Sequence, residues 1–151
     1  MKNIFLGLVE DISELLGYAR QDLQDFAPEA IRVEVKDVDF VIAHGRAPAD
    51  LLSIYCHFGT VAEENLSEEL TRLLEINLVL SSSCAGTLGF DALARQVIYV
   101  FHAPLRGLTA QELLQALLHA ARQAHAWRNG DFTQFTPAIA SDASSHVVVF
   151  A

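Results

Sequence analysis

Apolar residues recur at spacings of three and four in two early stretches of the chain, which predicts two amphipathic helices. In the first stretch, residues 3–19, the apolar positions are Phe5, Leu8, Val9, Ile12, Leu15, Leu16 and Ala19. In the second, residues 70–80, they are accompanied by one amide: Leu70, Leu73, Leu74, Asn77, Leu78 and Leu80. Glu68 and Glu69 stand just before the second stretch, where carboxylates suit the positive end of a helix.

A third helix has the clearest boundaries. Thr109 and Glu112 have the spacing of a capping box, in which each side chain accepts a hydrogen bond from the other residue's backbone amide. Asn129 and Gly130 are typical of a left-handed helix end. The buried stripe predicted between these ends consists of Leu113, Leu117, Ala120, Ala121, Ala124 and Trp127.

Alternating apolar and polar residues predict strands at 31–35, 38–42 and 51–58, with Lys36 and Asp37 as a tight turn. After the second helix, Ser81–Ser83 and the glycines at 86 and 89 end the helical pattern. Strands at 87–88 and 96–101 follow and form a hairpin around the loop 91–95. The order helix, three strands, helix, two strands, helix predicts a two-layer α+β domain with an antiparallel sheet.

The length of 151 residues suits one domain, because chains of this size bury about two thirds of their unfolded surface. We expect that domain to cover residues 1–130. Residues 131–151 are rich in Thr, Ser, Asp and Ala until His146–Phe150. They form either a frayed tail or a tail whose last residues, 146–150, make a strand.

Composition narrows the functional classes. With 52% hydrophobic and 19% charged residues the chain is too apolar to be disordered, yet no run approaches the roughly 18 apolar residues of a membrane span. A net charge of −9 with ten scattered Lys and Arg argues against binding nucleic acid, and the lack of such a run argues against a membrane partner. Glu10, Asp11 and Glu14 interrupt the apolar N-terminus, so a signal peptide is not predicted. Cys56 and Cys84 are expected to be reduced thiols in the cytoplasm.

No pattern indicates catalysis, a metal or a cofactor. The chain has no phosphate-binding GxxxxGK[ST] motif, and its six histidines lack metal-ligand spacing. Cys56 could pair with His57 or His102 only across the faces of a strand, since neighbouring strand residues point in opposite directions. The strand 96–101, however, is apolar on both faces, as is most of the helix near Leu80. Such two-sided apolarity in a small domain predicts a protein partner, with a homodimer as the first expectation.

A resemblance to a known family makes the expectation of a protein partner more specific. The run Leu-Glu-Ile-Asn-Leu-Val-Leu at 74–80, then Ala-Gly-Thr-Leu-Gly-Phe-Asp at 85–91, an aliphatic strand, and a helix ending in Ala126-Trp127-Arg128 resemble the class I chaperones of bacterial type III secretion, the Tir-chaperone family. The similarity follows the element order over 3–130 and the sequence itself over 66–130. It implies a homodimeric, cytoplasmic, ATP-independent chaperone that binds an extended N-terminal segment of a secreted effector.

By the family's pattern, the central helix and the following hairpin would form the dimer interface, through Leu73, Leu74, Asn77, Leu78, Leu80, Leu88, Val97, Tyr99 and Phe101. The first helix and first three strands would line the client groove, through Phe5, Leu8, Ile12, Val33, Val35, Phe40, Ile42 and Ile54. Two alternatives remain at this point. One is an α+β enzyme or small-ligand binder with a deep polar pocket, and the other is an adaptor for a folded partner.

Overall fold

The structure, a computed structural model, describes residues 2–17, 29–44, 50–81 and 86–130. Its elements in chain order are α1 (Lys2–Leu16), β1 (Ala30–Val35), β2 (Val38–His44), β3 (Leu51–Thr60), the short 3-10 helix η2 (Glu63–Asn65), α2 (Leu66–Ser81), β4 (Thr87–Asp91), β5 (Gln96–Pro104) and α3 (Ala110–Arg128). This order confirms the predicted α-β-β-β-α-β-β-α layout. Cys84 and the tail 131–151, with its expected strand at 146–150, lie outside the described residues.

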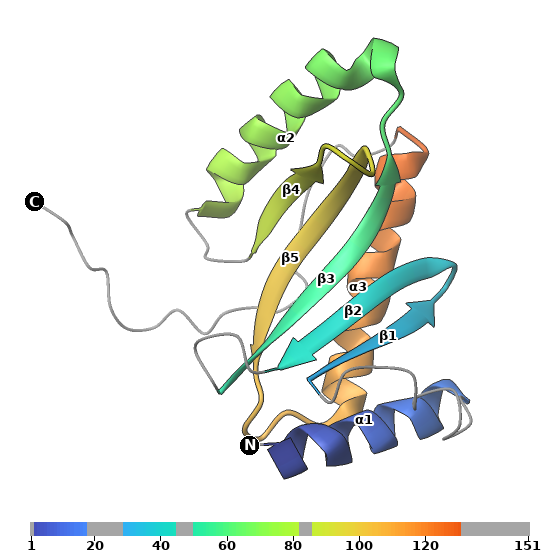
Figure 1. Cartoon of the computed structure of the whole chain (residues 1–151), viewed down its shortest axis with the longest axis vertical. Coiled ribbons are helices and arrows are strands. Elements are labelled where there is room, and N and C mark those ends of the chain that lie inside the picture. The colour runs from blue at the N-terminus through green and yellow to red at the C-terminus, as the bar shows by residue number, and fades with distance from the viewer. Residues whose placement is uncertain (1, 18–28, 45–49, 82–85, 131–151) are drawn as a thin grey trace, which may run out of the picture.

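All five strands belong to one antiparallel sheet in the order β1-β2-β3-β5-β4 (Figure 1). The pairing of β3 with β5 joins the first three strands to the later hairpin, and it runs from Leu51 opposite Pro104 to Thr60 opposite Gln96. Strand β5 therefore extends three residues beyond the predicted end at Phe101. The edges of the sheet are β1 on one side and β4 on the other.

The core fills the space between one face of the sheet and α3, which lies behind the sheet in Figure 1. Alternate residues of each strand point into it, as the buried positions of β1, β2 and β5 show. Helix α3 contributes Leu113 and Leu117 together with four buried alanines, whose small side chains let the helix approach the sheet closely. Its predicted capping box at Thr109 and Glu112 is present. Helix α1 packs against α3 through buried residues such as Phe5 and Ile12.

The C-terminal end of α3 is attached to the sheet by hydrogen bonds to backbone carbonyls. In the β1–β2 turn, Lys36 and Asp37 both have left-handed φ angles, 52° and 58°, as a two-residue hairpin requires. The Nε2 atom of His125 donates to the Lys36 carbonyl at 2.7 Å. The Arg128 guanidinium donates to the carbonyls of Asp37 at 3.1 Å, of residue 57 at 3.0 Å, and of residue 58.

The first helix ends earlier than the sequence predicts. Helix α1 stops at Leu16 instead of residue 19, because Gly17 adopts a left-handed φ of 77°. Its amide turns back to the Glu14 carbonyl at 3.2 Å, which closes the last turn.

Candidate functional site

Helix α2 lies alongside β4 (Figure 1). It carries apolar side chains on two faces. Leu73 and Leu80 face inward and are buried. Leu74, Leu78 and Val79 point outward and are 70%, 76% and 67% exposed. We call these three residues the α2 patch. Exposed aliphatic side chains gathered on one helix are typical of a surface that binds another protein.

Asn77, which the resemblance assigns to the dimer interface, makes both of its side-chain hydrogen bonds within the chain. Its Nδ2 atom donates to the Leu88 carbonyl at 2.7 Å, and the Leu88 amide donates to its Oδ1 atom at 2.8 Å. The carboxamide therefore attaches α2 to the outer side of β4.

The nine residues expected at a dimer interface differ in their exposure to solvent. Leu74 and Leu78 are exposed, and Asn77 is half-buried. The other six are buried within the chain itself: Leu73, Leu80, Leu88, Val97, Tyr99 and Phe101. Val97, Tyr99 and Phe101 lie on the core face of β5, and the Tyr99 ring packs against the rings of Phe58 and Phe101 at 5.9 Å and 5.1 Å between centres. The local sequence pattern did not reveal this burial.

The eight residues expected in a client groove all lie in the protein's own core. Phe5, Leu8, Ile12, Val33, Val35, Phe40, Ile42 and Ile54 are at most 7% exposed. They belong to the core of the chain, between α1, α3 and one face of the sheet, so other residues of the same chain cover them. Charged substitutions at these positions would report on folding rather than on binding.

The apolar side chains that α1 does expose are Ile4, Leu6 and Leu15, at 46%, 42% and 50%. They do not share one face, because residues two apart on a helix point to opposite sides: Ile4 and Leu15 lie on one side of the buried stripe and Leu6 on the other. We call the three together the α1 patch. Leu15 was predicted to be in the buried stripe, and the structure corrects that position. Ile4 and Leu6 fall beside the apolar stripe of the helix, and this offset is the sequence feature that could have identified them as surface residues.

The sheet face opposite α3 is lined by half-buried side chains and holds a cavity of about 400 Å³. Val41, Ala43, Tyr55 and Ile98 contribute to its walls. Two histidines on this face have side-chain partners. Nδ1 of His57 lies 2.8 Å from Oε1 of Gln96, and Nδ1 of His102 lies 3.3 Å from Oγ of Ser53.

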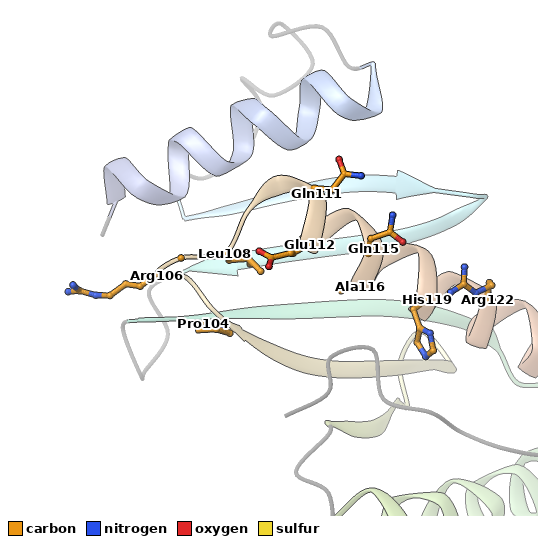
Figure 2. A pocket seen from close by; sticks show the side chains of 10 residues that line it. Pro104, Arg106, Leu108, Gln111, Glu112, Gln115, Ala116, His119 and Arg122 are labelled. Carbon is orange, nitrogen blue, oxygen red and sulfur yellow. The ribbon is translucent and has the colours of Figure 1, made fainter. Parts of the chain in front are cut away.

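Figure 2 shows a second cavity, of about 610 Å³, along the first half of α3. Its lining includes the polar side chains of Gln111, Gln115, His119 and Arg122 from the helix, together with apolar residues such as Leu108, while Arg106 points away from the others. The carboxylate of Glu112 belongs to the capping box. Hydrogen bonds from the backbone amide and hydroxyl of Thr109 hold the pKa of this carboxyl below its ordinary value, which favours the charged form. That carboxylate therefore supports the helix start.

Cys56 is not placed as a nucleophile. It lies on the α3 face of β3 and is buried, whereas His57 and His102 lie on the opposite face. Burial raises the pKa of the Cys56 thiol far above its ordinary value, and the charge of Arg128 offsets only part of this rise. Within the ranges that the structure describes, no three His, Cys, Asp or Glu side chains gather to hold a metal ion. No described helix is long and apolar enough to cross a membrane.

An α+β domain with one sheet face covered and apolar patches on two helices is a scaffold of the protein-binding class. The family follows from comparison. Residues 7–128 match the Tir chaperone protein (CesT) family, and the chain belongs to this family. The resemblance drawn from the sequence is confirmed. No curated protein matches the chain.

Solved structures confirm the fold. A chain from the structure of the HopA1-SchA chaperone-effector complex aligns with a TM-score of 0.65 at 14% identity, over 85% of this chain and 95% of that one. A chain from the crystal structure of the ExsC-ExsE complex aligns with a TM-score of 0.61 at 19% identity, over 81% and 89%. At these identities the likeness concerns the fold.

Proposed function

We propose that this protein is a type III secretion chaperone. As a homodimer in the bacterial cytoplasm, it binds an extended N-terminal segment of a secreted effector and keeps that segment soluble and competent for secretion. It needs no ATP or cofactor and is not an enzyme. The match of residues 7–128 to the Tir chaperone family carries this proposal. The description of one similar structure as a chaperone-effector complex supports the nature of the partner.

The α2 patch is the proposed dimer surface. Leu74 and Leu78 are one helical turn apart and about three quarters exposed, so their side chains form a continuous apolar ridge. A two-fold axis would bring the ridges of two copies together, since the same patch then occurs on both sides of the contact. Fully covering each leucine would contribute roughly 1.5–3 kcal/mol.

The proposed client surface combines the α1 patch with the edge strand β1. Residue 29 and His44 form a hydrogen-bonded pair at the start of the β1–β2 ladder, because the carbonyl of residue 29 accepts from the His44 amide at 2.7 Å. Alternation then directs the backbone groups of Ala30 and Arg32 away from β2, toward the outside of the sheet. An extended segment could add there as a further strand, while an apolar side chain of that segment packs on Leu6. The client-binding role thus stays with the predicted elements but moves to their exposed residues.

Leu6→Asp tests the client surface. Because Leu6 is 42% exposed, the charge should leave the fold and the dimer intact. The ligand is an effector segment that is first isolated by co-purification with the wild-type protein. Calorimetry should show that the Leu6→Asp protein binds this segment at least about tenfold more weakly, which corresponds to a loss of roughly 1.4 kcal/mol. Asn3→Asp adds the same charge at an exposed position near the start of α1 and should bind normally.

Unchanged affinity of the Leu6→Asp protein would place the client surface elsewhere. Co-purification of only a folded partner, with no extended segment protected from proteolysis, would favour an adaptor over a chaperone.

A further inference from the structure

The hydrogen bonds of Asn77 have the geometry of a strand pair. In an antiparallel ladder, one residue uses its N–H and its C=O to bond the same partner. Leu88 in β4 makes the same two bonds, but its partner is the side chain of Asn77. The Leu88 amide donates to Oδ1 at 2.8 Å, and the Leu88 carbonyl accepts from Nδ2 at 2.7 Å. The side chain thus occupies the position that the backbone of another strand would take.

Leu88, the residue bonded by Asn77, lies within a short edge strand. Strand β4 has five residues, and its pairing with β5 alternates, so only Leu88 and Phe90 direct their backbone groups outward within the strand. With Leu88 already bonded, no two successive outward residues remain for an added strand. A ladder built on Phe90 alone would have a single point of attachment.

We propose that Asn77 closes the β4 edge of the sheet and thereby directs an added strand to β1. The proposal rests on the proposed function in one respect: that the client adds as a strand. Open sheet edges also pair with other copies of the same chain, and covering an edge is one way in which proteins prevent this. Asn77 would therefore act both as a selector of the client's position and as protection against self-association.

Hydrogen exchange of the wild-type full-length protein tests the closure directly. The Leu88 and Phe90 amides both point outward from the same edge strand, but only Leu88 donates to Asn77. We expect Leu88 to exchange more slowly than Phe90 by about two- to tenfold, as a hydrogen bond of ordinary net strength implies. Equal rates would overturn the proposal without any variant.

Asn77→Ala should remove this difference and give a concentration-dependent larger species in light scattering. Thr71→Ala is the matched control, because the Thr71 hydroxyl donates within α2 itself, to the Ser67 carbonyl at 2.9 Å, and that variant should behave as wild type. Adding Gly89→Lys to Asn77→Ala should suppress the larger species, since a lysine on an edge strand opposes pairing. An added Cβ at residue 89 comes no closer than 3.9 Å to the Ile98 carbonyl oxygen.

If Asn77→Ala keeps the wild-type size and the wild-type Leu88 exchange rate, the closure proposal is wrong. Once a client segment is isolated, its binding should slow exchange at Arg32 and leave Phe90 unchanged, and slowing at Phe90 would refute the directing role. The closure experiments use no client, so they stand or fall independently of the proposed function.

Discussion

Gly86 lies where the chain enters β4, and its lack of a side chain is a structural requirement. Its φ of 119° is one that residues with a Cβ rarely adopt. An added Cβ would lie 2.5 Å from the Val100 carbonyl oxygen and 2.8 Å from Cε2 of the buried Tyr99 ring. Neither neighbour can move easily, because the first is sheet backbone and the second is core.

Gly86→Ala is therefore expected to lower the free energy of unfolding by about 2–4 kcal/mol, measured by urea denaturation. Gly89→Ala is the matched control three residues later, where an added Cβ makes only an ordinary contact at 3.9 Å. It should change stability by less than about 1 kcal/mol. Equal effects of the two substitutions would show that the close approach at Gly86 is relieved by movement of the chain.

At the scale of elements, Arg128 connects the end of α3 to two parts of the sheet. Its guanidinium donates to carbonyls in the β1–β2 turn and at residues 57 and 58 of β3. The β3–β5 register shifts between residues 57 and 59, so the charge satisfies carbonyls at an irregular part of the ladder. The adjacent Trp127 packs its ring 6.4 Å from the Phe58 ring, centre to centre.

Arg128→Met keeps the aliphatic stem and removes the three hydrogen bonds. Because the site is partly exposed, we expect a loss of about 2 kcal/mol in the free energy of unfolding. Arg122→Met on the exposed side of the same helix should have little effect on thermal denaturation. A stability loss confined to Arg128→Met supports the attachment, whereas equal losses would indicate a general effect of removing positive charge from α3.

At the scale of the whole molecule, the α2 patch predicts how two copies meet. Leu78 is 76% exposed in the single chain, so Leu78→Asp should not unfold the protein. It should instead place a charge in the centre of the proposed contact, where burial without a partner costs several kcal/mol. Light scattering at micromolar concentration should give the mass of a dimer for the wild type and of a monomer for the variant.

Leu93→Asp is the identical substitution at a leucine that is 100% exposed and lies in the β4–β5 loop, outside α2, and it should leave the dimer intact. Circular dichroism should show folded protein in both cases. A wild-type monomer at this concentration would contradict the homodimer, and a dimeric Leu78→Asp protein would move the interface away from α2.

Much of the architecture follows from interactions between near neighbours in the sequence. The alternation of Ile31, Val33 and Val35, the turn at Lys36 and Asp37, and the capping box at Thr109 each depend on a few adjacent residues. Their predictions are confirmed for this reason. The Leu-Glu-Ile-Asn-Leu-Val-Leu run and the following glycine-containing segment were sufficient to indicate the family, which residues 7–128 match.

The exposure of individual side chains was decided by the tertiary structure. An apolar stripe shows that a face will be covered, but it does not show whether the cover is the same chain or a partner. Here α3 lies against the sheet face that holds Phe40 and Ile54, and the pairing of β5 with β3 brings Tyr99 next to the Phe58 ring. Those contacts join residues far apart in sequence, so periodicity could not predict them. They determine that the exposed apolar surfaces are the α1 and α2 patches, and that Asn77 bonds the edge of its own sheet.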